Sequence, residues 1–294
     1  MAALFGAILS LTMTFILTRS ASSRIFLKMS GRAYTSVVNT ASRGIGLEFT
    51  RQLLHKAETK QVFALCRNSS PSVGLVGLQE QFGSKLVVIP GVDLEDDSSI
   101  QSAVKCVSDQ AENGVDLLIN CAGILGDNSP EMPGPERSIL KIDPAWLRKT
   151  MTVNFMAHVL MTQGIAPLMK RRKPKKGEVL TEEDKGAIWN LSARVGSITD
   201  NHLGGWTSYR CSKTALNQFT RNAAIELKRH HVGVYSIHPG TTDTGLSKPF
   251  QKNLPAGQLL TCEEACSQML RVMDTTPLEE TGSFWAFDGK RIEW

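Results

Sequence analysis

The sequence predicts an α/β protein in which one parallel sheet is covered by helices on both faces. Apolar runs of strand length alternate with helix-like segments from residue 34 to the C-terminus, a few dozen residues apart, which argues for βαβ units. The first run leads into a small-residue turn that ends in Gly44 and Gly46 and opens a helix. The 294 residues are 41% apolar and include 24 glycines, as in ordinary globular α/β proteins. One large domain can therefore bury its own core.

The elements follow in a regular order. Short apolar runs, typical of buried parallel strands, predict strands at 35–38, 61–66, 85–93, 115–123, 186–193, 232–240 and 283–287. Longer segments between them predict helices at 47–57, 98–112, 144–169, 206–230 and 262–274; the segment 98–112 is clearly amphipathic. No internal repeat or interdomain linker interrupts this pattern. A single domain over residues 34–294 is expected.

The placement of charge argues against a nucleic-acid partner. The formal net charge is +5, but Arg19, Arg24, Lys28 and Arg32 lie in residues 1–32, which hold no acid, so the remainder carries only 5 − 4 = +1. A basic run and then acidic residues fill 170–186, between a helix and a strand. We expect a solvated surface loop there; nuclear import or anion binding is the less favoured interpretation.

The six cysteines are scattered, mostly within apolar runs, which is typical of reduced thiols and not of a disulfide framework. Cys262 and Cys266 lie one helical turn apart, without a nearby histidine or a second cysteine pair. The six histidines show no ligand spacing. No metal site is predicted.

Residues 1–30 are predicted to be a hydrophobic and basic extension. The apolar run 2–17 is shorter than the ~20 residues of a spanning helix, and its charges follow the run instead of preceding it as in a secretory peptide. An organellar presequence, a membrane anchor through residues 2–17 and a frayed extension with Met29 as a second start all stay open. The predicted location is the cytoplasm or the mitochondrion.

The turn after the first strand predicts a dinucleotide site. In "VVNTASRGIGLEF" (37–49), glycines between a strand and a helix let backbone N–H groups approach a phosphate at the helix N-terminus. The second strand ends in "ALCRN" (64–68). An arginine at that strand end suits the 2′-phosphate of NADP, whereas a carboxylate would suit the free ribose of NAD. With Arg67 there and Arg43 in the turn, NADP(H) is predicted over NAD(H).

A tyrosine and a lysine four residues apart predict acid–base chemistry. In a helix that begins near Trp206, Tyr209 and Lys213 share one face. The pKa of a phenol is ordinarily near 10, and an adjacent ammonium is expected to lower it. Tyr209 could then give a proton to a carbonyl oxygen while hydride arrives at the carbon.

Several motifs in a fixed order carry a family resemblance. They are "SRGIG" (42–46), "VDLEDD" (92–97), "NCAG" (120–123), "VNFMAH" (153–158), "NLSARVGSI" (190–198), "GGWTSYRCSKTALN" (204–217), "HPGTTDTGLSKPF" (238–250) and "DGKRIEW" (288–294). From Val37 to Trp294 the chain resembles the short-chain dehydrogenase/reductase family, and within it the C-factor and sniffer-type carbonyl reductases.

The resemblance implies a single Rossmann-type, doubly wound parallel sheet of about seven strands with helices on both faces. It implies Tyr209 as the acid–base, Lys213 at the nicotinamide ribose and Asn154 as the residue that holds a water in the proton path. Asp93 is expected at the adenine, and residues 239–244 close over the nicotinamide. The cofactor-binding residues expected are Ser42, Arg43, Gly44, Ile45, Gly46, Arg67, Asp93, Leu94, Asn120, Ala122, Gly123, Tyr209, Lys213, Pro239, Gly240, Thr241 and Thr244.

Two positions depart from the family pattern. Its turn begins Thr-Gly, whereas this chain has Asn39 and Thr40, and the β-branched Thr40 stands where a bare residue is usual. The family serine that polarises the substrate carbonyl falls on Ala193, three residues before Gly196. Ser192, one residue earlier, is our prediction for its substitute, although a shift of one residue at a strand end can reverse a side chain.

The predicted function is NADPH-dependent reduction of an aldehyde or ketone, with a small-molecule substrate that the sequence does not identify and a monomer or homodimer as the active form. Two alternatives remain at this point. Thr40 and Ala193 suggest an NADP(H)-binding regulatory protein with little catalysis, and residues 2–17 suggest a membrane-tethered structural partner.

Overall fold

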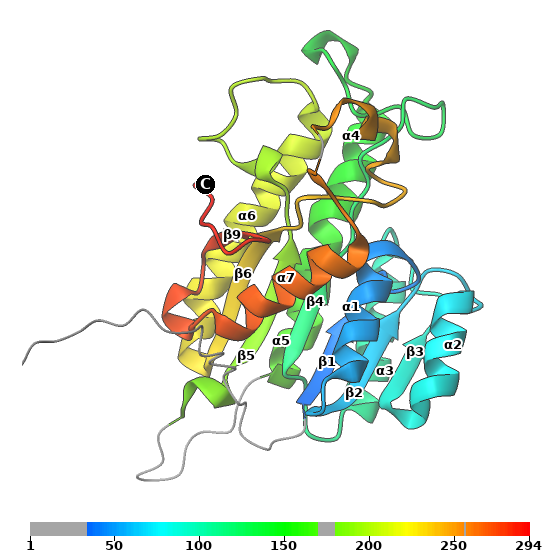
Figure 1. Ribbon diagram of the computed structural model, residues 1–294, viewed down its shortest axis with the longest axis vertical. Helices are drawn as coiled ribbons and strands as arrows, with labels where there is room; N and C mark the ends of the chain where they lie inside the picture. The colour runs from blue at the N-terminus through cyan, green and yellow to red at the C-terminus, as the bar shows by residue number, and fades with distance from the viewer. Residues whose placement is uncertain (1–33, 170–179, 256) are drawn as a thin grey trace, which may run out of the picture.

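The structure is a computed structural model that describes residues 34–169, 180–255 and 257–294 (Figure 1). The predicted N-terminal extension and the basic run 170–176 lie outside the described residues. Among the residues described, no helix has the length and apolar character needed to cross a bilayer.

Seven parallel strands form one sheet, as predicted. The strand order is β3-β2-β1-β4-β5-β6-β9, so the chain builds outward from β1 in one direction and then returns to build outward from β4 in the other. The strands are β1 (Tyr34–Val38), β2 (Thr59–Leu65), β3 (Leu86–Ile89), β4 (Leu117–Asn120), β5 (Gly186–Leu191), β6 (Val232–His238) and β9 (Phe284–Ala286). A separate two-stranded pair, β7 (Thr241–Thr242) and β8 (Leu259–Leu260), follows the end of β6. In sheets of this kind ligands bind at the carboxyl ends of the strands where the order reverses, here between β1 and β4.

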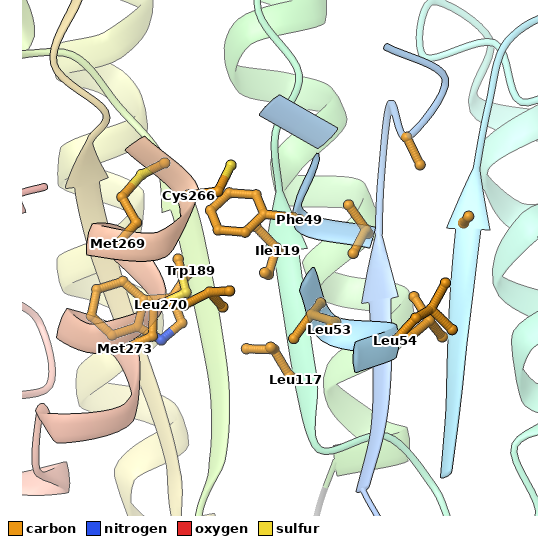
Figure 2. Packing of buried hydrophobic residues seen from close by; sticks show 14 of the residues in the cluster. Phe49, Leu53, Leu54, Leu117, Ile119, Trp189, Cys266, Met269, Leu270 and Met273 are labelled. Atoms are coloured by element: carbon orange, nitrogen blue, oxygen red, sulfur yellow. The ribbon is translucent and has the colours of Figure 1, made fainter. Parts of the chain in front are cut away.

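Helices cover both faces of the sheet, which confirms the predicted fold class (Figure 1). They are α1 (Gly44–His55), α2 (Val73–Phe82), α3 (Asp97–Gln110), α4 (Pro144–Met151), α5 (Ala157–Met169), α6 (Thr207–Leu227) and α7 (Cys262–Thr275). Neighbouring residues of a strand serve opposite layers: Leu118 and Ile188 pack with α3, α5 and α6, whereas Ile119 and Trp189 pack with α1 and α7. Figure 2 shows the second layer, in which Phe49 of α1 and Cys266 and Met269 of α7 lie over the same face of the sheet.

Two helix predictions need correction. The sequence interpretation missed α2, which has glycines at positions 74 and 77 and only Leu75 and Leu78 buried, so its apolar stripe is too thin to show a period. The segment 144–169 was predicted as one helix, but a π-helical stretch, η3 (Thr152–Met156), separates α4 from α5. Single π-turns inside helices occur frequently at functional sites.

Candidate active site

The glycine turn after β1 is built for close backbone approach. A Cβ on Gly46 would lie 2.4 Å from the Thr40 carbonyl oxygen, and Gly44 has a φ of +55°. The helix that follows, α1, has no acidic residue in its first turn and no side-chain cap from Arg43. Within the described ranges, its first N–H groups have no intrahelical acceptor and no cap from the Arg43 side chain, which leaves them free for a pyrophosphate. These residues fit the diphosphate of a dinucleotide.

Asn39 ties this turn to the end of β4. Its Oδ1 accepts hydrogen bonds from the backbone N–H groups of Cys121 (2.6 Å) and Ala122 (3.2 Å), and its Nδ2 donates to Asn120 Oδ1 at 2.7 Å. Asn120 in turn donates to Asn190 Oδ1 on β5 at 2.8 Å. Asn39 and Asn120 are fully buried, so Asn120 acts here as a brace between strands that fixes the crevice.

Thr40 takes the left-handed conformation, with φ +52°. A β-branched residue is an outlier there because its side chain crowds the following carbonyl. The chain thus keeps the backbone path that glycine would take and carries the strain. The pocket beside it is lined by Asn39, Thr40, Leu65, Cys66, Arg67, Val92 and Leu94.

Thr40→Gly is expected to raise the free energy of unfolding by about 0.5–1 kcal/mol, because relief of the left-handed strain exceeds the entropy cost of glycine. Urea unfolding of both proteins measures the change. Thr242→Gly, at a residue with no such φ, is the matched control and should destabilise. A less stable Thr40→Gly protein would show that the threonine contacts outweigh the backbone strain.

The expected adenosine side is partly assembled. Arg67 and Leu94 both line the pocket, while Asp93 does not; Asp93 is exposed, and its Oδ1 accepts from the backbone N–H of Glu95 at 2.9 Å. Arg43 is also exposed. The two arginines stand at the turn and at the next strand end, where a 2′-phosphate would meet them.

The loop after β6 meets the glycine turn from the other side. The Thr244 side chain would be 3.5 Å from a Cβ on Gly44. Gly240, with φ +71°, has no room for a Cβ because Phe287 would lie 2.8 Å away. Thr241 pairs with Leu259 in the β7–β8 ribbon, which holds the loop in place. Pro239 and residues 240–244 thus lie at the carboxyl end of β6.

The acid–base candidates and the end of β4 converge on one spot. Tyr209 and Lys213 lie one turn apart on α6 and are buried, at 8% and 2% exposure, with the Lys213 Nζ 6.0 Å from the phenol ring centre. Lys213 Nζ donates to the carbonyl oxygens of Leu191 (2.7 Å) and Ala122 (3.4 Å). A Cβ on Gly123 would lie 3.7 Å from this Nζ and 3.9 Å from Asn154 Oδ1. Gly123, at the end of β4, therefore lies beside both Lys213 and Asn154.

The electrostatics of the pair differ from the sequence prediction. Burial raises the pKa of the Tyr209 phenol, whereas an ammonium was expected to lower it. Burial also lowers the pKa of Lys213 to about 7, opposed only in part by Cys121. Both charged forms lose hydration in the same enclosed region, and that loss dominates. Without a cofactor, the phenol is therefore a proton donor at neutral pH.

Asn154 lies in the π-helical stretch and binds a loop on one side and α6 on the other. Its side chain accepts from the Ile124 N–H at 2.7 Å and donates to the Ile124 carbonyl at 2.9 Å. Its Nδ2 also reaches Ser212 Oγ at 3.1 Å, and Ser212 donates to the Tyr209 carbonyl at 2.8 Å. Asn154 is thus connected to the backbone of Tyr209 through Ser212, a link that the sequence motifs did not indicate.

Ser192 does not face the phenol. Its hydroxyl donates to Asn217 Oδ1 at 2.6 Å, and Asn217 lies two turns beyond Tyr209 on α6, roughly 12 Å along the axis. Ala193, in contrast, packs in one buried cluster with Tyr209 and Leu125. This geometry gives no support to Ser192 as the substitute for the family serine, because its hydroxyl forms a hydrogen bond that connects the end of β5 to α6.

Aromatic and aliphatic side chains surround Tyr209, and sequence reasoning missed them. Val195, Trp206 and Phe250 pack against the cluster of Leu125, Ala193 and Tyr209, and the six residues come from four separate segments of the chain. The Trp206 ring lies edge-on to Tyr209 at 6.4 Å and tilted against Phe250 at 5.3 Å. The Trp206 backbone is left-handed, φ +54°, a strained conformation of the kind that clusters at functional sites.

A buried carboxylate fixes the start of α6. Glu136 is 6% exposed; one carboxylate oxygen accepts from the Ser208 N–H at 3.2 Å and the other from the Ser208 hydroxyl. Its carbonyl accepts from the N–H of Trp206, a helix N-cap without a side-chain cap of its own. Glu136 thus supplies the missing cap from a distant loop, next to Tyr209. No sequence pattern marks a cap that comes from so far away.

Comparison with known proteins confirms the predicted family. A model of the short chain dehydrogenase family matches residues 35–255. The structure of NADPH-bound carbonyl reductase from chicken fatty liver is similar, with 30% identity, a TM-score of 0.75, and coverage of 90% of this chain and 100% of that one. Carbonyl reductase Sniffer of Drosophila melanogaster shares the fold at 22% identity and a TM-score of 0.76, with 90% and 100% coverage. The C-signal protein of Myxococcus xanthus is 27% identical over 180 residues, 61% of this chain and 93% of its own length.

Proposed function

The chain belongs to the short-chain dehydrogenase family, and from that premise we propose that it is an NADPH-dependent reductase that converts an aldehyde or ketone to an alcohol. The observation that carries the proposal is the buried convergence of Tyr209, Lys213 and Asn154 beside Gly123, at the strand ends where the sheet order reverses. A site of this kind is where a parallel sheet binds a dinucleotide. The non-catalytic alternative gains nothing from these contacts, because a binding protein has no need of an acid–base beside the crevice.

Each residue has a role that follows from its position. A bound dihydronicotinamide supplies the hydride for the carbonyl carbon. Tyr209 gives its proton to the carbonyl oxygen as charge develops there, and its raised pKa keeps that proton in place at neutral pH. Lys213, anchored on the Leu191 carbonyl, would hold the ribose side of a bound cofactor and help to return a proton to the phenol. Asn154 keeps the Ile124 segment and α6 at a fixed separation.

The preference for NADPH rests on the two exposed arginines. Arg67 lines the pocket beside Thr40, and Arg43 precedes the first turn of α1. Of the residues that the structure describes, those lining that pocket include no carboxylate that could bind a free ribose hydroxyl pair. The carbonyl reductase from chicken, 30% identical to this chain, is described as NADPH-bound.

The test is direct turnover. Purified full-length protein, mixed with NADPH and a panel of aliphatic and aromatic aldehydes and ketones, is expected to oxidise NADPH at 340 nm and release the alcohol. NADPH binding by calorimetry without turnover of any panel member would contradict the proposal.

Arg67→Ala is expected to raise the Kd for NADPH by at least about 10-fold, since a charge-assisted phosphate contact contributes roughly 1.5–3 kcal/mol. The Kd for NADH should change less than about 2-fold, because NADH has no 2′-phosphate for the guanidinium to bind. Calorimetry with both cofactors measures the two values. Arg210→Ala is the matched control, since that guanidinium binds the backbone carbonyls of Gly205 and Val195. Equal losses with both cofactors would contradict the assignment of Arg67.

A further inference from the structure

Apolar side chains pack around the Tyr209 ring. Leu125 and Ala193 are buried against it, and Val195, Trp206 and Phe250 pack on that cluster. Among the described residues, none donates a hydrogen bond to the Tyr209 hydroxyl, and this hydroxyl is not one of the buried polar atoms without a partner. It therefore reaches the edge of the cluster, where a substrate oxygen can meet it.

The nearest serine on β5 is engaged elsewhere. The Ser192 hydroxyl donates to Asn217 Oδ1 at 2.6 Å, and Asn217 itself donates to the Gly196 carbonyl at 3.2 Å. Ser192 is 3% exposed, so its proton cannot turn to a ligand without leaving a buried amide oxygen unpaired. At the position that does face the phenol, Ala193 offers a methyl group.

A carbonyl that accepts hydride develops negative charge on oxygen, and each hydrogen-bond donor aimed at that oxygen lowers the barrier. At positions 192 and 193, no serine hydroxyl is free to act beside the phenol, because Ser192 is bound to Asn217 and position 193 is alanine. The polarisation that such a hydroxyl would supply has to come from the substrate itself. The rings of Trp206 and Phe250 pack on each other at 5.3 Å beside Tyr209, and aromatic rings of this kind favour contact with a flat aromatic body.

We infer that this site, which has no free serine hydroxyl at positions 192 and 193, selects aromatic carbonyl compounds that are already electron-poor, and that Ala193 is the residue that determines this selectivity. The inference rests on the proposed function and narrows its substrate class. In the step itself, the hydride and its electron pair form the new C–H bond, and the carbonyl π pair moves to oxygen. The oxygen takes the Tyr209 proton, so NADPH is oxidised to NADP⁺ and the carbonyl is reduced to the alcohol.

The experiment is a series of para-substituted benzaldehydes, from methoxy to nitro, reduced by the full chain with NADPH deuterated or not at the transferred position. A primary isotope effect establishes that hydride transfer limits the rate. For wild type, kcat/KM is expected to rise at least about 100-fold from the methoxy to the nitro compound. Ala193→Ser should raise kcat/KM for the methoxy compound about 10–100-fold but kcat/KM for the nitro compound less than about 3-fold, because it adds one oxyanion donor. Ala193→Cys is the matched control, because its thiol is similar in size to the serine hydroxyl but is a weak donor. It should keep the wild-type slope, defined as the change of log kcat/KM with the electron-withdrawing power of the para substituent.

A second readout does not depend on turnover. The carbonyl stretch of 4-(dimethylamino)benzaldehyde bound together with NADP⁺ should shift to lower frequency in Ala193→Ser than in wild type, because the added hydroxyl polarises the bond. An unchanged stretch would overturn the assignment of Ala193.

The outcomes separate the two proposals. If no benzaldehyde or other carbonyl is reduced although NADPH binds, the proposed function fails and this inference fails with it. If turnover is found but kcat/KM depends on the para substituent to the same degree in wild type and in Ala193→Ser, the proposed function is retained and the inference about Ala193 is wrong. If Ala193→Ser does not fold, a shallow wild-type slope with an isotope effect still contradicts the inference.

Discussion

Tyr209→Phe is expected to lower kcat/KM for NADPH-dependent carbonyl reduction by about 10³-fold or more, the upper part of the range for a lost general acid. The ring that packs on Trp206 and Ala193 is kept, so only the proton donor disappears. The hydroxyl makes no hydrogen bond within the described part of the chain, so the free energy of unfolding should change by less than about 0.5 kcal/mol. Steady-state kinetics and urea unfolding measure the two effects.

Tyr235→Phe is the matched control and should show the reverse pattern. Tyr235 stacks on Trp189 at 4.4 Å and its hydroxyl donates to the Pro277 carbonyl at 3.0 Å, remote from the crevice between β1 and β4. Its loss should cost about 1 kcal/mol of stability and leave kcat/KM within about 2-fold of wild type. If Tyr209→Phe retained its activity, another group would have to supply the proton, and the proposed mechanism would be wrong.

The fold was predictable because it depends on repeated patterns. Apolar runs such as 115–123 and 232–240 mark strands buried on both faces, and seven of them with helices between leave few alternatives to a parallel sheet. The helix α2 was not predictable from such a pattern, since two buried leucines give no stripe. The π-turn at Thr152–Met156 was also hidden, because its residues still have the composition of a helix interior.

The candidate site was predictable where one helix or one turn carries it, as with Tyr209 and Lys213 or Gly44 and Gly46. Contacts between distant segments were not. The buried Glu136 carboxylate that caps α6 comes from a loop 72 residues before Ser208. No recognisable pattern in the sequence links two positions so far apart. The direction of the Tyr209 pKa was wrong for the same reason, since burial is a property of the folded chain and outweighs the neighbouring ammonium.

The second large effect concerns protein stability and comes from the free-energy cost of burying the Lys213 ammonium. Its pKa is about 7 in the folded chain against an ordinary 10.5, because burial removes water from the ammonium and two carbonyl oxygens replace only part of it. The unfolded chain keeps the proton up to about pH 10.5, whereas the folded chain releases it near 7. The contribution of Lys213 to the free energy of unfolding is therefore at its maximum above pH 10.5. It decreases as the pH falls from 10.5 and is lost once the pH has fallen through 7.

Lys213→Met is expected to abolish carbonyl reduction and yet stabilise the protein at low pH. Each pKa unit corresponds to about 1.4 kcal/mol, and the two carbonyl oxygens left unpaired by the substitution reduce the gain. The free energy of unfolding of the variant should therefore exceed that of wild type by about 2–4 kcal/mol at pH 6. The difference should shrink steadily between pH 7 and 10, as the wild-type lysine becomes neutral in the folded state. Urea unfolding at a series of pH values measures it, because titrations shared by both proteins cancel.

Lys105→Met is the matched control, since Lys105 has a side chain 75% exposed that pairs with Asp109 at the surface. Its stability difference from wild type should stay small and flat from pH 6 to 10. A flat difference for Lys213→Met as well would mean that the ammonium is adequately solvated in the fold. A difference that falls with pH would instead identify Lys213 as a group retained at the expense of stability, as expected of a residue kept for catalysis.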